Sequence, residues 1–578
     1  MITKPLSQNL NKIGLKEGDN NGLDAFFWFI LTAAFAIRIW GIWNVSTTDE
    51  YNEVIEALRV ASGHLNFERW IKRLYLYILA GEFGVYYIVG RILGIFVSPM
   101  DFAEKIIRNM EPLFILGRIT SAIFGTYTVG LTYLIGKRFF NRRVGMMASF
   151  LLCVTVFHVD LSQQAKVDAL LGALCLTVFY FIFKLLSERP MRIWDWTWCG
   201  VFFGLAIQAK LNVIALLVPI GVTLFLLRRE IESKVPVIIG LLFGALIGFI
   251  LGNPPVIIAP IKFLSNILGY GTKVYTTPVN VVPSEVIGFV AYPFFYLNAL
   301  GWPISLLTMG ALVYAFLRIN APRLVILSFI VVFYIEMGFL SSLVDAYYLI
   351  PIVPLVFLLA GEFTDQVYQK VKSGRRFSQA WARASLLIVT CLVLYYPLSN
   401  LAYHELSLLG KNTRYIAKDW IEANIPSNSK ILMDSGKSIN SFAPPIAENV
   451  ESLNRILRNA QENVSKGKII HEIVDRNALV YYELLLKTVP ETAYDITSTM
   501  FGLELQSLEY YLANGYEYFI ISDSMKKART NKFAQDNLTN AASFYSSLHS
   551  DNRITLVKVI KPSLRNRGDQ FLIYRVGL

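Results

Sequence analysis

The sequence predicts a polytopic α-helical membrane protein that ends in a smaller, water-soluble α/β domain. Hydrophobic residues make up 54% of the 578 residues and charged residues 17%, and the mean hydropathy is +0.47, well above a soluble average. Uncharged runs of about 18 residues recur up to residue 402 and fit membrane-spanning helices, which satisfy their own backbone polar groups. Beyond residue 402 charges return and the apolar runs shorten to strand length.

The placement of basic residues orients these helices. Basic residues gather in short connections such as GKRFFNRR (136–143), as in cytoplasmic loops. Threaded on that rule, about eleven helices cross the membrane, and the N-terminus lies in the cytoplasm. The long connections 44–112 and 253–293 and the tail then lie outside. The predicted spans are 25–43, 113–136, 145–159, 168–186, two shorter helices within 198–227, then 236–252, 294–317, 324–341, 347–361 and 384–402.

The segment 70–97 tests this threading. It is apolar enough to span, but it carries Lys72, Arg73, Glu82 and Arg91. If it crossed the membrane, every later basic loop would change sides. We therefore expect it to lie in the membrane interface, as other amphipathic helices do.

Two domains are predicted: a transmembrane domain over 1–402 and a soluble extracytoplasmic α/β domain over 403–578. In the tail, YIAKDWIEANIP is expected to form an amphipathic helix that stops at Pro426. SKILMD, EYFIIS, RITLVKVI and QFLIYRV are expected to form short buried strands.

The composition argues against several other classes of protein. Cys153, Cys175, Cys199 and Cys391 all lie in apolar spans, so neither a disulfide framework nor a cysteine metal site is expected. The formal net charge of +12 is explained by cytoplasmic loops rather than by a nucleic-acid partner. No cofactor and no metal are predicted, although adjacent acids leave a divalent ion open as an alternative.

Ionisable residues at the outer ends of the helices are the candidate functional groups, because charges are expensive in a membrane. Asp49 and Glu50 are adjacent in STTDEYNE, directly after the first span. The alternative role for Asp49 is to cap a helix running through EVIEALRVA, in whose first turn acids are favoured.

Three further polar clusters fall on the same outer side. The segment FHVDLSQQAKVDALL contains His158, Lys166 and Asp168, and IQAKLNV contains Lys210. The fourth cluster is Asp345 with Tyr347 and Tyr348. Each has an ordinary alternative, such as a solvated turn or a lysine that reaches out of the membrane, but four clusters on one side favour a site.

The ordered motifs resemble the GT-C glycosyltransferases, specifically the protein O-mannosyltransferase and aminoarabinose (lipid A) transferase family. TTDE after the first span, LGRITSAIFGTYTVGLTYLIGKRFF, FHVDLSQQAKVDALL, IQAKLNVIALL, GNPPVI and YYLIPIVPLVFLLAG carry the resemblance over about 25–402. The tail resembles the outer domain that bacterial members append. One departure is Tyr347, because relatives often have an arginine there, so a phosphate-holding arginine cannot be carried over.

The resemblance implies an inverting glycosyltransferase with a GT-C fold in a prokaryotic plasma or inner membrane. Its donor would be a polyprenyl- or dolichyl-phosphate sugar, and its acceptor a hydroxyl of a protein, lipid or glycan at the outer face. A lipid phosphate leaves without full protonation, so one carboxylate base can suffice. Asp49 is the expected base, and Glu50 is expected to orient the acceptor or the sugar.

The other candidates are expected to bind substrate. Lys166 and Lys210 would contact the phosphate, since its developing charge needs nearby cations. Asp168 would orient a lysine or bind the acceptor. His158, Tyr347 and Tyr348 complete the predicted substrate-binding set.

Two other functions remain open: a transporter or flippase of lipid-linked substrates, and an inactive relative that docks partners through its outer domain. Transporters usually show inverted repeats and broken helices. The sequence indicates neither, which favours the transferase.

Overall fold

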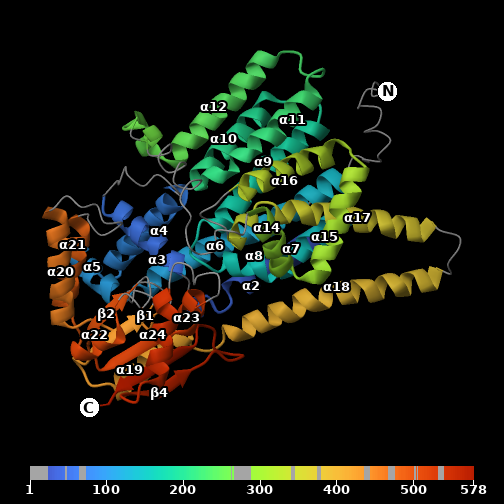
Figure 1. The fold of residues 1–578 in the computed structure, drawn as a ribbon. Coiled ribbons are helices and arrows are strands. Elements are labelled where there is room, and N and C mark those ends of the chain that lie inside the picture. Colours follow the sequence, from blue (N-terminus) through green and yellow to red (C-terminus); the bar gives the residue numbers. More distant parts are fainter. Residues whose placement is uncertain are drawn as a thin grey trace. The chain divides into compact units, whose positions relative to one another are not determined.

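The fold is given by a computed structural model of the chain (Figure 1). The structure describes residues 24–577, except for 46–47, 64–72, 262, 266–287, 340–344, 374–378, 435–442, 466–475, 500–502, 504–505 and 531–538. The chain divides into two compact units. Unit 1 comprises Met1–Trp40, Ser62–Ile78 and Gly117–His404, and unit 2 comprises Gly41–Ala61, Leu79–Leu116 and Glu405–Leu578. The predicted domain boundary at 402/403 stays a prediction.

The described helices make the chain a multi-pass helical membrane protein. Five stretches are long and apolar enough to cross a membrane, and a sixth joins them if two helices bent by 64° form one span. The prediction of about eleven crossings therefore goes beyond what helix length and composition support in the described residues. The five are Ala25–Asn44, Glu111–Phe140, Asp168–Ser187, Lys234–Gly252 and Ala321–Gly338; the bent pair is Arg142–Val154 with Val156–Ser162.

Most predicted spans coincide with helices, although two are broken. The predicted helix 145–159 is α7 (Arg142–Val154) followed by α8 (Val156–Ser162), with Thr155 extended between them. The predicted helix 294–317 is α14 (Gly288–Leu300) and α15 (Trp302–Leu317), separated by Gly301 at φ 74°. Glycine adopts this backbone conformation without a steric penalty. The expectation that no spanning helix is broken was therefore wrong.

The remaining helices complete both units. The segment 70–97 contains α4 (Arg73–Ile92), which is not among the five candidate spans; its position in the interface stays a prediction. The other helices are α2 (Ala25–Ile39), α3 (Thr48–Ala61), α5 (Pro99–Arg108), α6 (Glu111–Ile135), α9 (Asp168–Ser187), α10 (Ile193–Ala209), α11 (Leu217–Leu227), α12 (Lys234–Gly252), α16 (Ala321–Gly338), α17 (Val353–Ser373) and α18 (Gln379–Ser407).

Helices α10 and α12 pack backbone to backbone (Figure 1). Gly240, Gly244, Gly248 and Gly252 recur every fourth residue on the buried face of α12. A Cβ added at Gly248 would lie 1.9 Å from the carbonyl oxygen of Val201 on α10. Small residues at this spacing let helices approach closely in a membrane, where packing drives association. The glycine face of α12 therefore fixes the position of α10.

The C-terminal region of unit 2 contains a mixed five-stranded sheet in the order β2-β1-β3-β5-β4. β1 pairs in parallel with β2 and β3, and β5 pairs antiparallel with β3 and β4. The strands are β1 (Lys430–Asp434), β2 (Asp495–Thr499), β3 (Tyr518–Ser522), β4 (Ile554–Ile560) and β5 (Phe571–Val576). The four predicted strands are present, but β4 is mostly exposed, so the predicted burial is confirmed only for β1, β3 and β5. The prediction missed β2.

Alternating residues of the strands build a core on each face of the sheet. On one face, Ile431 and Met433 pack with Ile421 of α19 (Thr413–Asn424), the predicted amphipathic helix. On the other face, Leu432 and Phe519 pack with α22 (Leu508–Ala513) and α24 (Thr539–Ser550). Side chains of a strand alternate between faces, so one apolar run can serve both layers. The same region also contains α21 (Arg476–Lys487) and α23 (Asp523–Thr530).

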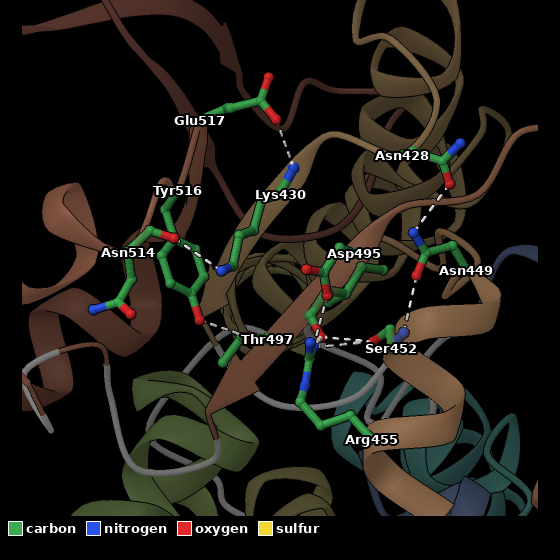
Figure 2. A network of polar contacts seen from close by, with 11 residues as sticks. Asn428, Lys430, Asn449, Ser452, Arg455, Asp495, Thr497, Asn514, Tyr516 and Glu517 are labelled. Atoms are coloured by element: carbon green, nitrogen blue, oxygen red, sulfur yellow. Dashed lines mark hydrogen bonds and ion pairs between the residues drawn. The ribbon is translucent and has the colours of Figure 1, made fainter.

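The edge strand β2 is covered by side chains of α20 (Val450–Ser465), as Figure 2 shows. The hydroxyl of Ser452 donates to the carbonyl oxygen of Ile496 at 2.9 Å. Arg455 donates to the same carbonyl at 3.0 Å and to the carboxylate of Asp495 at 2.7 Å. Satisfying edge groups in this way prevents pairing with another chain.

The glycine contact of α12 leads to a prediction. Gly248→Leu should force α10 and α12 apart and lower the free energy of unfolding by about 1–3 kcal/mol or more, the usual cost of overpacking. Thermal unfolding of the detergent-solubilised protein measures the change. Gly221→Leu on α11 is the matched control, because nothing lies within 4 Å of a Cβ added there. Equal melting temperatures for the two variants would contradict the packing argument.

Candidate active site

A cluster of buried polar side chains lies in unit 1, where helices begin or break. We call it the lysine–tyrosine cluster; it consists of Lys166, Asp168, Lys210, Tyr347 and Tyr348. Lys166 precedes α9 and Asp168 is its first residue. Lys210 follows α10, and the tyrosines lie in the 3₁₀ turn η5 (Ala346–Leu349). Segments far apart in the sequence thus meet around one carboxylate.

The carboxylate of Asp168 contacts both lysines. Lys210 Nζ donates to Asp168 Oδ1 at 2.9 Å, and Lys166 Nζ lies 3.8 Å from Oδ2. The exposed fractions are 1% for Asp168, 5% for Lys166 and 7% for Lys210. Coulomb attraction between such groups is much stronger than in water, because the surroundings are poorly polarisable. One carboxylate therefore holds two ammonium groups together.

The two tyrosine rings cover the same ammonium groups. Lys166 Nζ lies 4.4 Å from the ring centre of Tyr347, and Lys210 Nζ lies 4.3 Å from it. Lys210 Nζ is also 4.2 Å from the ring centre of Tyr348. At these distances the negative face of an aromatic ring attracts a cation. The tyrosine rings thus lie against the ammonium groups, Tyr347 against both and Tyr348 against that of Lys210.

Local backbone structure fixes Lys166. Its N–H donates to the carbonyl of Gln164 at 2.7 Å, and its own carbonyl accepts from the hydroxyl of Ser121 on α6 at 3.2 Å. The hydroxyl of Tyr75 on α4 lies 2.9 Å from that of Ser121. Because both backbone groups of Lys166 are hydrogen-bonded, the bend before α9 is fixed, and the Lys166 side chain extends from it toward Asp168.

Lys210 occupies the break between α10 and the 3₁₀ helix η3 (Leu211–Leu216). Its N–H still donates to Ala206 at 3.0 Å, but its own backbone is extended, with φ −162° and ψ 130°. The chain therefore leaves the helix at Lys210 and the side chain reaches Asp168.

Asp345 caps η5 by accepting from the N–H of Tyr347 at 3.4 Å.

The cluster combines a shared carboxylate with deep burial. Elsewhere in unit 1, Asp24 also pairs with two basic residues, Lys137 and Arg142, but these side chains are 22–55% exposed. Lys184 Nζ donates to Asp195 Oδ1 at 2.6 Å in a one-to-one pair. Arg323 donates two hydrogen bonds to the carboxylate of Glu362, at 2.9 and 2.6 Å. In the cluster, two lysines share Asp168. Desolvating charges costs free energy that ion pairing often does not recover, so stability alone does not account for a second buried lysine. An ionisable group within a membrane protein is by default a functional-site hypothesis.

The structure brings together five of the predicted site residues, the whole lysine–tyrosine cluster. His158 lies on α8 and its described contacts are elsewhere: its Nδ1 is 2.9 Å from the guanidinium of Arg38 on α2. Sequence reasoning missed Arg38, which is fully buried. Its signal was an arginine within the first apolar run, a costly position.

The two predicted catalytic acids belong to unit 2. Asp49 is the second residue of α3, and Glu50, 1% exposed, follows it. This place in the first turn of a helix keeps the capping alternative open. Among the described residues, no group of three or more His, Cys, Asp or Glu could hold a metal ion. The predicted roles of all eight residues stay proposals.

Comparison with protein families supports the resemblance. Residues 113–258 match the family model described as "Dolichyl-phosphate-mannose-protein mannosyltransferase". This segment includes Lys166, Asp168 and Lys210, so the predicted resemblance is confirmed where most of the cluster lies. The search of curated proteins finds no match.

Two solved structures are similar to this chain. ArnT from Cupriavidus metallidurans bound to undecaprenyl phosphate is 10% identical; the alignment covers 95% of this chain and 97% of that chain, with a TM-score of 0.48. The archaeal oligosaccharyltransferase AglB from Archaeoglobus fulgidus, in complex with an inhibitory peptide and a dolichol-phosphate, is 12% identical. That alignment covers 89% of this chain and 72% of the AglB chain, with a TM-score of 0.48.

The shared carboxylate leads to a stability prediction. Asp168→Asn leaves Lys166 and Lys210 without this carboxylate and should lower the free energy of unfolding by about 3–5 kcal/mol. Denaturant unfolding in detergent measures it. Glu188→Gln breaks the exposed contact with Arg138 and should cost at most about 1 kcal/mol. If both variants lost the same stability, Asp168 would not hold the cluster together.

Proposed function

We propose that this protein, whose residues 113–258 match the protein mannosyltransferase family model, is an inverting glycosyltransferase with a GT-C fold. The match supports this proposal, because the description of that family names a dolichyl-phosphate sugar. Its donor is a sugar linked to polyprenyl or dolichyl phosphate. Its acceptor is a hydroxyl group of a protein, lipid or glycan. Transfer takes place at the outer face of a prokaryotic cell membrane.

The observation that carries the proposal is the pair of lysines on Asp168. In the transfer, the bond between the anomeric carbon and the phosphate oxygen breaks, and the electron pair stays on the phosphate. Lys166 and Lys210 supply positive charge for that developing anion, because preorganised charges need no rearrangement during the reaction. Lysine binds phosphate as a point charge. Tyr347 and Tyr348 hold the ammonium groups, and Asp168 orients them.

The acceptor must lose a proton when it attacks. Asp49 is the proposed general base: it takes the proton from the acceptor hydroxyl while the oxygen attacks the anomeric carbon opposite the phosphate. The new bond forms as the old one breaks, so the configuration inverts. Glu50 orients the acceptor or the sugar. His158, held beside Arg38, has a proposed role in binding substrate.

A transporter or flippase is the alternative. The bend of 64° between α7 and α8 removes one argument against it, because transporters often contain broken helices. The two functions differ in their product. A transferase yields the free lipid phosphate and a glycosylated acceptor, whereas a flippase leaves the lipid-linked sugar intact.

The phosphate assignment predicts the effect of losing each lysine. Lys210→Met and Lys166→Met should each weaken binding of undecaprenyl phosphate by about 10–100-fold, the factor for one hydrogen bond to a charged group. Binding is measured with the purified protein in nanodiscs. Lys184→Met is the matched control, since Lys184 pairs with Asp195 near the far end of α9. Unchanged affinity in both cluster variants would exclude these lysines as phosphate ligands.

The base assignment predicts a separate loss. Asp49→Asn keeps the capping ability, since Asn caps helices about as well as Asp, but removes the base. Sugar transfer should fall by about 10²–10⁴-fold, while donor binding and thermal stability stay near normal. If Asp49 only caps α3, Asp49→Asn should transfer sugar normally and Asp49→Ala should lose about 1 kcal/mol of stability.

A further inference from the structure

The buried amide of Gln208 lies two residues before Lys210 of the lysine–tyrosine cluster, and its nitrogen has no hydrogen-bond partner among the described residues. Gln208 is in the last turn of α10 and is 3% exposed. Among the residues that the structure describes, none accepts a hydrogen bond from its Nε2. Its stem rests on the end of α12: a Cβ added at Gly252 would lie 2.6 Å from Gln208 Cβ and 2.9 Å from its Cγ. Glycine at 252 therefore makes room for this side chain.

Two polar groups belong to the same place. Asn253 follows Gly252 and is 3% exposed, and its Oδ1 accepts from the hydroxyl of Tyr77 on α4 at 3.4 Å. We call Gln208, Asn253 and Tyr77 the amide group. It lies at the ends of α10 and α12, where both helices leave their glycine-packed contact.

The amide group is linked to the cluster by both of its chain segments. Lys210 follows Gln208 by two residues and bonds Asp168. Tyr75 precedes Tyr77 by two residues and contacts Ser121, whose hydroxyl donates to the carbonyl of Lys166. Two residues span at most about 7 Å along the chain, so the backbones at Gln208 and Tyr77 lie within about 7 Å of those at Lys210 and Tyr75.

The chemistry of the two places is different. The cluster presents ammonium groups, which suit a phosphate. The amide group presents neutral donors and acceptors, which suit hydroxyl groups. A buried donor without a partner costs stability, and native proteins rarely keep one without a reason. A ligand oxygen that accepts from Gln208 Nε2 would provide that reason.

We propose that Gln208, with Asn253 and Tyr77, forms a second subsite that binds hydroxyl groups of the donor sugar. The proposal rests on the proposed function, because it assumes that the phosphate of the same donor occupies the cluster. The amide group then selects among sugars. A site built to hydrogen-bond a hydroxyl strongly rejects an analogue that lacks it, since its buried polar groups are left unpaired.

The test compares two lipids: undecaprenyl phosphate, and the donor that the wild type binds most tightly from a panel of hexose- and pentose-phosphoryl undecaprenols. Gln208→Met should bind the sugar-bearing donor about tenfold more weakly, the loss of about one hydrogen bond. It should bind undecaprenyl phosphate normally. Its melting temperature should be unchanged or higher, because an unpartnered donor has been removed. Tyr77→Phe, which removes one hydroxyl, should show the same selective loss.

Ser305→Ala is the matched control: Ser305 on α15 is also fully buried, and its hydroxyl has no partner among the described residues. It should change neither affinity. Equal losses for both lipids, or no loss for either in both amide-group variants, would overturn the sugar subsite. Lys210→Met separates the two proposals. It should lose affinity for both lipids. Normal binding of both lipids by this variant and by Lys166→Met would refute the phosphate assignment instead.

Discussion

The carboxylate of Asp168, shared by two buried lysines, is the interaction on which the rest of unit 1 depends. Lys210 reaches it only because α10 ends at Ala209, and α10 is held in place by the glycine face of α12. Lys166 reaches it because the bend before α9 is tied to Ser121 on α6. Helix packing, helix breaks and charge are thus parts of one arrangement. Burying these charges is expensive, and the proposed lipid phosphate between the ammonium groups would account for the cost.

Much of this could be predicted from the sequence, because the two strongest signals are local. Apolar length gives the spans, and costly charges give Lys166, Asp168 and Lys210 before any geometry is known. The breaks within two of the predicted helices could not be predicted from apolar length or charge. Thr155 and Gly301 interrupt runs that stay apolar throughout. Hydropathy therefore predicts one helix where the backbone forms two. In the tail, β2 was missed because DITST is mostly polar and its pairing partner β1 is distant in sequence.

The pairings within the site were equally hidden from the sequence. Tyr347 appeared as a departure from the arginine of relatives, whereas its ring faces both lysines at 4.4 and 4.3 Å. An aromatic ring attracts a cation but carries no charge of its own. Within the lysine–tyrosine cluster, the positive charge is therefore that of the two lysines. Arg38 has a signal in the sequence, an arginine within an apolar run, but its contact with His158 appears only in three dimensions. Gln208 has no such signal, and only the structure shows that its amide nitrogen has no partner among the described residues.

The most direct test of the central claim is an experimental structure of the protein with undecaprenyl phosphate bound in nanodiscs. We expect phosphate oxygens within about 2.7–2.9 Å of Lys166 Nζ and Lys210 Nζ, the length of a charge-assisted hydrogen bond. Tyr347 and Tyr348 should remain against the ammonium groups. A phosphate bound to other cations, such as the buried Arg73 or Arg118, with the lysine–tyrosine cluster unchanged, would contradict the account.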